Sequence, residues 1–301
     1  MATLRCEMWL ACTGLAAALL TGCLPSRAAG AAEFIPPPKP TATATVTAGP
    51  PAPPSTPTAP PPTATPTAVD GALFPIGTSV GGRALEVARF GSGPRELLIV
   101  AGIHGGYEWN TIALADELIE RLRQDPAIVP ADVALYLLRA MNPDGEARSH
   151  GADGRANDNG VDLNRNWPID WHPDWDRTYC WNYLPISAGP HPVSEPEVAA
   201  VMQFILDHEF EAMISYHSAA LGIFPGGSPP DTASHRLAAA LARVSGYPYP
   251  PLDYGCEYTG QFADWTVSQG IAAVDVELTT HVDTDFEINL RVLETFLNWK
   301  P

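Results

Sequence analysis

Apolar residues recur along positions 70–301 in two patterns, one typical of buried strands and one typical of helices. Continuous apolar runs of strand length predict strands that are buried on both faces of a sheet. These runs are Leu97–Ile103, Val133–Ala140, Ala212–His217 and Ala272–Leu278. Apolar residues gathered on one helical face predict amphipathic helices between and after these strands. These helices are Asn110–Arg123, Glu195–Leu206, Ser234–Val244 and Phe286–Trp299.

The alternation of strands and helices predicts an α/β fold. We expect three α/β/α layers, in which helices cover both faces of a mixed, mostly parallel sheet. Ser194 and Glu197 have the spacing of a capping box, with Pro196 between them, so the second helix is expected to begin at a serine cap. The range 70–301 is long enough for one domain with a sizeable core.

The first 22 residues have the features of a secretory signal. Arg5 precedes an apolar segment, Met8–Leu20, that is too short to cross a bilayer as a mature helix. The segment ends in Leu20-Thr21-Gly22-Cys23, which resembles the bacterial lipoprotein signal, where the chain is cut before the cysteine and the new terminus is lipidated. We therefore predict a signal peptide over 1–22 and an extracytoplasmic lipoprotein that meets the membrane only through Cys23. A secreted protein with an ordinary cleaved signal is the alternative.

Residues 23–69 are predicted to form the lipidated terminus and a linker. From Ala28 to Ala68, Pro, Thr and Ala dominate and large apolar residues are few. Such a composition cannot bury a core and favours an extended, semi-rigid chain. The globular domain is therefore expected to occupy 70–301.

The domain over 70–301 is strongly acidic, with 14 basic and 32 acidic residues and a net charge of −18. This charge argues against nucleic acid as a partner and against electrostatic docking on anionic lipid. Two of the five cysteines, Cys180 and Cys256, lie in the domain. In an oxidising compartment they could pair, and two unpaired cysteines are the alternative.

Three metal-ligating side chains lie at the ends of predicted strands. His104 directly follows the first apolar run, Glu108 comes four residues later, and His217 ends the third run. Open α/β sheets place their ligands at the carboxyl ends of strands, and zinc accepts both imidazole nitrogen and carboxylate oxygen. A hydrogen-bonded His–Glu pair would be the simpler interpretation of His104 and Glu108 alone. The third ligand, His217, favours a zinc site.

A polar string with an arginine lies between the two histidines. It reads Gly-Val-Asp-Leu-Asn-Arg-Asn-Trp over Gly160–Trp167, and Asn142-Pro143-Asp144-Gly145 precedes it. An arginine in a polar turn can hold a carboxylate through two parallel hydrogen bonds.

Together these segments resemble the zinc carboxypeptidase family over essentially all of residues 75–300. The Gly160–Trp167 string carries the resemblance, as does its order relative to both histidines and to Val274–Leu278. The resemblance implies the zinc carboxypeptidase fold, one Zn²⁺ per domain, and a metallocarboxypeptidase that hydrolyses the carboxyl-terminal bond of peptides. It implies His104, Glu108 and His217 as the metal ligands, a ligand set that is itself a known example of a catalytic zinc site.

The resemblance also implies roles around the metal. Glu277 matches the general base that takes a proton from a zinc-bound water, whose pKa zinc lowers to about 7. Arg155 matches the arginine that polarises the scissile carbonyl, and Asn164 with Arg165 matches the pair that holds the terminal carboxylate of a peptide. Tyr258 is the first match for a tyrosine that closes over substrate, and Tyr254 is the second. We expect such an enzyme to be a monomer.

Two features depart from the family, and one of them is that the segment from Tyr258 to Trp265 is shorter than in the pancreatic enzymes. Three residues separate His104 from Glu108, where the family usually has two, and the flexible Gly105-Gly106 pair can absorb the extra one. Two other functions stay open: a cell-wall peptide amidase or peptidase, or small-molecule deacylase, of the same fold, and a non-catalytic surface binding module. The binding module is disfavoured because all three ligands and Glu277 are present.

The preferred terminal residue is a separate question. Ala263, just before Asp264-Trp265, matches the family's main selectivity position, and its small apolar side chain suggests an apolar pocket. Asp275 lies two residues before Glu277 and is therefore expected to face the same cleft. There it could favour a basic or amino-bearing terminal residue, unless neighbouring groups hydrogen-bond it away from substrate.

Overall fold

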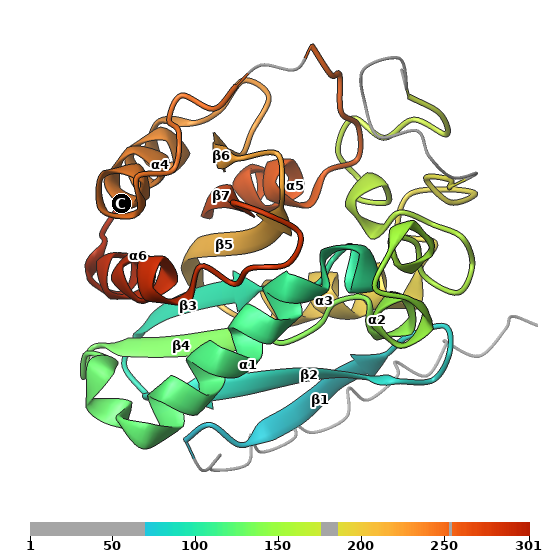
Figure 1. Ribbon diagram of the computed structural model, residues 1–301. Helices are drawn as coiled ribbons and strands as arrows, with labels where there is room; N and C mark the ends of the chain where they lie inside the picture. Colours follow the sequence, from blue (N-terminus) through green and yellow to red (C-terminus); the bar gives the residue numbers. More distant parts are fainter. Residues whose placement is uncertain (1–69, 176–185, 253–254) are drawn as a thin grey trace, which may run out of the picture. The chain divides into compact units, whose positions relative to one another are not determined.

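The computed structural model describes residues 70–175, 186–252 and 255–301 (Figure 1). The predicted signal peptide, lipidated terminus and linker lie outside these residues, so those three predictions stay as predictions. Within the described ranges, no helix combines the length and the apolar character that a membrane span requires.

The described residues form a seven-stranded sheet with the order β1-β2-β4-β3-β5-β7-β6. Its four central strands β4, β3, β5 and β7 run parallel to one another, β2 and β6 pair antiparallel with the outer two of these, and β1 pairs antiparallel with β2. The strands are β1 Leu73–Thr78, β2 Ala84–Phe90, β3 Arg95–Val100, β4 Val133–Leu138, β5 Phe210–Ser218, β6 Gly222–Pro225 and β7 Ala272–Leu278. The predicted mixed, mostly parallel sheet is confirmed.

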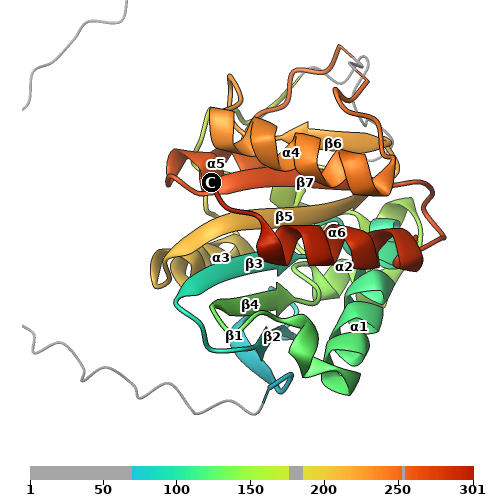
Figure 2. The ribbon, with the colours of Figure 1, turned by 90° about the vertical axis from the view of Figure 1, so that its left-hand side faces the viewer.

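Helices cover both faces of the sheet, as predicted (Figure 2). On one face lie α1 (Trp109–Gln124), α4 (Thr232–Ser245) and α6 (Phe286–Asn298). On the other lie α3 (Pro196–Leu206) and α5 (Phe262–Ser268). The three-layer arrangement follows because the parallel strands are buried on both faces, and each face needs its own apolar cover.

Two apolar clusters hold the layers together. In the first, Leu114, Leu118 and Leu122 of α1 join Phe296 of α6 against the sheet, and all four side chains are buried. Each such side chain contributes about 1.5–3 kcal/mol when it leaves water. The second cluster, around Trp167, packs α3 and α5 on the opposite face. Each cluster packs the helices of one layer against one face of the sheet.

The strand boundaries show where the apolar pattern was informative. Strand β7 has the predicted bounds, and β4 is buried at all six of its residues but ends at Leu138, two residues before the end of the predicted run Val133–Ala140. Strand β3 ends at Val100, three residues before the end of its apolar run, because Gly102 turns the chain with φ +65°. Strands β1, β2 and β6 were not predicted.

The predicted capping box is wrong. Helix α3 begins at Pro196 with Glu195 as its N-cap, and no side chain caps it. The hydroxyl of Ser194 donates to Glu195 Oε1 at 2.6 Å. The Glu197 carboxylate accepts from the backbone N–H of Val80 at 3.0 Å. The Glu197 side chain therefore ties α3 to the turn after β1, and the Ser194 hydroxyl bonds the adjacent N-cap side chain instead of the backbone of the first turn.

Candidate active site

Four chemically active side chains meet at the carboxyl ends of three adjacent parallel strands. His104 follows β3, and Glu108 ends the short 3₁₀ helix Gly105–Glu108. His217 lies on β5, directly opposite Glu277 on β7 in the parallel register. Residues that are up to 173 positions apart in the sequence therefore meet at one edge of the sheet, where open α/β sheets place their ligands.

The extra residue between His104 and Glu108 fits because two glycines let the turn lie against the loop that follows α2 (Pro143–Arg148). Gly105 has φ +48°, a conformation that side chains rarely adopt. A Cβ at Gly106 would lie 1.9 Å from the backbone oxygen of Ser149. The close approach of these two backbones therefore requires glycine, and it leaves His104 and Glu108 side by side.

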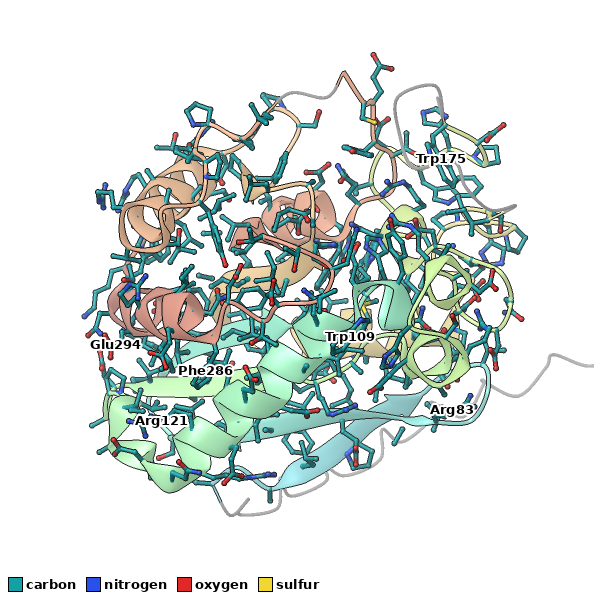
Figure 3. The ribbon with its side chains drawn as sticks, in the orientation of Figure 1. Arg83, Trp109, Arg121, Trp175, Phe286 and Glu294 are labelled. Carbon is teal, nitrogen blue, oxygen red and sulfur yellow. The ribbon has the colours of Figure 1, made fainter. Side chains whose placement is uncertain are left out.

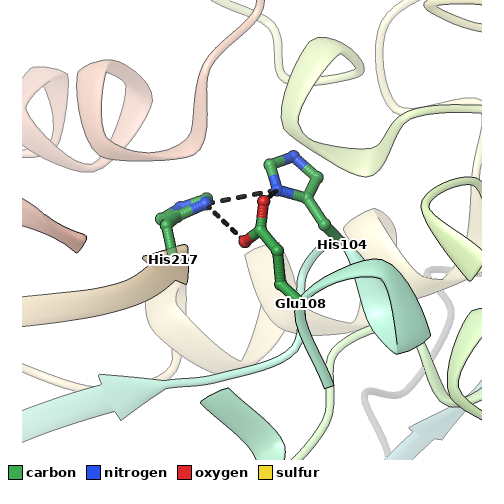
Figure 4. A group of neighbouring side chains, drawn as sticks. All are labelled: His104, Glu108 and His217. Carbon is green, nitrogen blue, oxygen red and sulfur yellow. Dashed lines mark hydrogen bonds and ion pairs between the residues drawn. The ribbon is translucent and has the colours of Figure 1, made fainter. Parts of the chain in front are cut away.

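His104, Glu108 and His217 form a buried group with the dimensions of a metal site (Figure 4). His104 Nδ1 lies 2.7 Å from Glu108 Oε1, and His217 Nδ1 lies 3.3 Å from both His104 Nδ1 and Glu108 Oε2. Ligand atoms on a tetrahedral zinc ion, each about 2.0–2.2 Å from the metal, are about 3.3 Å apart. The donor set and its spacing therefore fit zinc.

The outer nitrogen of each histidine faces a second group. His104 Nε2 lies 3.3 Å from Asp162 Oδ1. His217 Nε2 lies 3.0 Å from Ser215 Oγ and 3.5 Å from Asp275 Oδ1. Carboxylates in such positions commonly orient ligating histidines. Sequence reasoning did not single out Asp162, although it stands inside the Gly160–Trp167 string.

The two glutamates of the site have opposite electrostatic surroundings. Burial by itself would raise the pKa of Glu108, but His104 and His217 hold this pKa well below its usual range. Burial raises the pKa of Glu277 to about 7. One oxygen of Glu277 accepts the backbone N–H of Ala220 at 2.9 Å. Glu108 is thus set up as an anionic ligand and Glu277 as a group that exchanges protons near neutral pH.

Arg155 lies beside the histidine–glutamate group and is buried. Its Nε donates to Asp162 Oδ2 at 2.9 Å, and its Nη1 lies 3.5 Å from Glu108 Oε1. Its guanidinium also lies over the ring of Tyr107. These contacts fix Arg155 at the wall of the site next to the carboxylate ligand.

Asn164 and Arg165 line the same cavity as the histidine–glutamate group. Asn164 Oδ1 accepts the backbone N–H of Phe262 at 2.8 Å, which leaves the amide nitrogen as its donor. Arg165 is 3% exposed, and its Nη1 donates to the backbone oxygen of Asn164 at 2.7 Å. Its guanidinium lies 4.7 Å from the ring centre of Tyr258 and 5.5 Å from that of Trp175. Stacking of this kind holds the planar fork in one orientation.

The predicted site residues line one open cavity of about 1110 Å³. Tyr258 borders it and is 37% exposed, which suits a side chain at the mouth of the cavity. Trp175 borders it as well, and Figure 3 shows it at the upper right of the view, away from Arg121 and Glu294 at the left. The structure therefore brings every predicted site residue to one cavity: His104, Glu108, Arg155, Asn164, Arg165, His217, Tyr258 and Glu277.

Two sequence predictions concern residues outside the described ranges. Tyr254, the second match for the closing tyrosine, lies outside them, as does Cys180. Cys256 is disulfide-bonded and also lines the cavity.

The sequence pattern of the zinc carboxypeptidase family matches residues 71–294. Mouse carboxypeptidase A6 is 30% identical over 241 residues, which cover 66% of this chain and 53% of that protein. The murein peptide amidase A of Escherichia coli strain K12 is 28% identical over 241 residues, covering 76% of this chain and 92% of the amidase. This chain therefore spans about half the length of the mouse relative and nearly the whole length of the amidase.

Solved structures give the same picture of the fold. The murein-tripeptide amidase of Escherichia coli O157 superposes with a TM-score of 0.60 and 26% identity, over 78% of this chain and 95% of the amidase. A carboxypeptidase A from Helicoverpa armigera superposes with a TM-score of 0.59 and 18% identity, over 75% of this chain and 66% of that one.

Proposed function

The chain belongs to the zinc carboxypeptidase family, and on this basis we propose that it is a zinc metallocarboxypeptidase that releases the carboxyl-terminal residue of peptides. One observation carries the proposal. The zinc-compatible group His104, Glu108 and His217 shares a single cavity with Glu277 and with the buried guanidinium of Arg165. The first four side chains supply hydrolysis, and Arg165 supplies a reason for the reaction to occur at a free carboxyl end.

In this proposal His104, Glu108 and His217 hold the metal. Zinc, when bound, supplies a Lewis acid and a water of lowered pKa. Glu277 accepts a proton from the attacking water and passes it to the leaving amine, a role that suits a carboxyl group with a pKa raised to about 7. Its hydrogen bond from Ala220 keeps the carboxylate at the cavity wall.

Arg155, Asn164 and Arg165 bind and orient the peptide. The Arg165 fork and the Asn164 amide donate to the terminal carboxylate, and a bidentate pair of this type fixes both position and direction. Arg155 stabilises the negative charge that develops on the scissile carbonyl oxygen, which is often the largest catalytic contribution. Tyr258 covers the bound terminus from the mouth of the cavity.

A murein-peptide amidase is the second candidate. The supporting observation is length: this chain covers 92% of the curated amidase and 95% of the solved one, against about half of the mouse carboxypeptidase. The same side chains would act on an amide bond in a cell-wall peptide. Parallel assays with a murein tripeptide and with ordinary blocked dipeptides decide between the two.

We further propose that the protein is an extracytoplasmic lipoprotein anchored through Cys23. The proposal rests on the Leu20-Thr21-Gly22-Cys23 string and on the Pro/Thr/Ala-rich segment that follows it. A domain on such a linker would reach peptides outside the cytoplasm.

The test of the proposed activity is release of the last residue from blocked dipeptides with a free carboxylate, measured for wild type and Glu277→Gln. The amide cannot accept the water's proton, so the variant should keep its fold and its zinc and lose several orders of magnitude in turnover. If Glu277→Gln retained more than about a tenth of the wild-type rate, Glu277 would not be the base.

A further inference from the structure

Asp275 faces the substrate cavity one step deeper than the catalytic carboxylate. It lies on β7 two residues before Glu277, and residues two apart on a strand point to the same face. The register places Ser215 opposite Asp275 and His217 opposite Glu277. Asp275 lines the cavity together with Glu277 and Arg165. The Asp275 carboxylate therefore lies deeper in the cavity than the reacting groups, on the side where the terminal residue of the substrate would bind.

The two oxygens of Asp275 have different surroundings. Oδ1 is buried, forms no hydrogen bond with any described residue, and lies 3.5 Å from His217 Nε2. The side chain as a whole is 14% exposed, so its exposed surface belongs to the rest of the group and opens on the cavity. A partly buried carboxylate that lacks a full set of partners is costly, and a bound cation would offset that cost.

The groups near Asp275 that can carry positive charge, His217 and Arg165, both have other roles in the proposed function. Among the described residues that line the cavity, seven carboxylates stand against two guanidinium groups, those of Arg155 and Arg165. Arg155 is paired with Asp162, and Arg165 is assigned to the terminal carboxylate in the proposed function. Ala263 also lines the cavity, and its small side chain takes up little of the space that a long substrate side chain would need.

Asp264 is a second carboxylate of the cavity, and it serves as an internal comparison. Its Oδ1 accepts the backbone N–H of Gly227 at 2.7 Å, and its Oδ2 accepts the amide of Gln261 at 3.2 Å. Burial and the nearby charge of Asp275 raise the pKa of Asp264. Both oxygens of Asp264 are therefore already bonded, and Asp275 is the better-placed acceptor for a substrate cation.

We infer that Asp275 selects peptides whose terminal residue carries an ammonium or guanidinium group on its side chain, an inference that rests on the proposed carboxypeptidase function. Arg165 holds the carboxylate of that residue and Asp275 holds its side-chain cation. Lysine, arginine and the diamino acids of wall peptides share this chemistry. The small apolar residue at Ala263 alone would have indicated an apolar pocket, and the charge of Asp275 reverses that expectation.

The contact with His217 gives Asp275 a competing role, in which it only orients a metal ligand. The two roles differ in what they do to selectivity. A residue that orients His217 affects all substrates equally, because every substrate uses the same metal. A residue that binds a substrate cation changes the ratio between charged and uncharged substrates.

The experiment compares kcat/KM for two blocked dipeptides ending in lysine and in norleucine, which differ in the terminal ammonium. Wild type should prefer lysine by about tenfold or more, and Asp275→Asn should reduce the preference to about threefold or less. Asparagine has the same shape and keeps an oxygen for His217, and zinc content is measured for each protein. A third peptide, ending in diaminopimelate, separates a wall-type diamino acid from lysine, and preference for either over norleucine supports the inference.

Asp264→Asn is the matched control and should change the ratio less than Asp275→Asn does. An unchanged ratio in Asp275→Asn, or a wild type that prefers norleucine to both lysine and diaminopimelate, overturns the inference while leaving the proposed hydrolysis intact. If wild type hydrolyses none of the peptides, the proposed function fails. Calorimetric binding of the lysine and norleucine peptides to Glu277→Gln then tests Asp275 without turnover, and equal affinities overturn its role.

Discussion

Replacing Arg165 by methionine should abolish the discrimination between a peptide with a free terminal carboxylate and the same peptide with a terminal amide. Arg165 is 3% exposed and is held between Tyr258 and Trp175, so its fork is fixed before substrate binds. Removing such a partner from a substrate carboxylate in a buried site weakens binding by about 2–5 kcal/mol, which lowers kcat/KM by about 30-fold to several thousandfold. The amidated peptide makes no ionic pair and should lose little.

The assay measures kcat/KM for both peptides in wild type, Arg165→Met and Arg165→Lys, with thermal unfolding as the check on the fold. Asp162 keeps its hydrogen bond from Arg155 in these variants, so no buried carboxylate is left without a cation. Lysine retains the charge and loses the fork, and it should give an intermediate ratio. If Arg165→Met kept the wild-type ratio of carboxylate to amide hydrolysis, Arg165 would not be the group that recognises the terminus.

Three further predictions concern the turn, the base and the anchor. Gly106→Ala should lower the melting temperature by several degrees, because the added Cβ would overlap the backbone at Ser149. Gly151→Ala should change it little, because the nearest atom to the added Cβ lies 3.4 Å away. Equal melting temperatures of the two variants would contradict the packing argument. The hydrolysis rate should fall as pH falls through the pKa of Glu277, because the protonated acid cannot accept a proton from water. Burial places that pKa at about 7 in the metal-free protein, and bound zinc lowers it. An acidic limb above pH 7 in the pH–rate profile would therefore contradict the assignment. Cys23→Ser should move the protein from the membrane fraction to the soluble fraction, and unchanged partition would count against lipidation.

Sequence alone predicted the parts of the fold that are buried on both faces. Strands β4 and β7 appear as continuous apolar runs because they lie between other strands and under two helical layers. Strands β1, β2 and β6 are edge or antiparallel strands with mixed exposure or few residues, so their apolar signal is weak. The predicted serine cap of α3 was wrong for another reason. The Ser194 hydroxyl hydrogen-bonds the Glu195 side chain, and this contact is visible only in the folded chain.

The candidate site divides in the same way. His104, Glu108 and His217 could be named as candidate ligands because they lie at or just after the ends of predicted strands, and Glu277 could be named from the family resemblance. Asp162 could not be assigned a role, because its contacts with His104 and with Arg155 depend on how three separate loops meet.

The most direct test of the central claim is the zinc content of the purified full-length protein together with its hydrolytic activity. Wild type should carry one zinc per chain, lose activity when a chelator removes the metal, and regain it when zinc is restored. His217→Ala should remain folded without stoichiometric zinc and without activity, because two ligands hold the ion far less tightly than three. Full activity in the metal-free protein, or tight stoichiometric zinc in His217→Ala, would contradict the account.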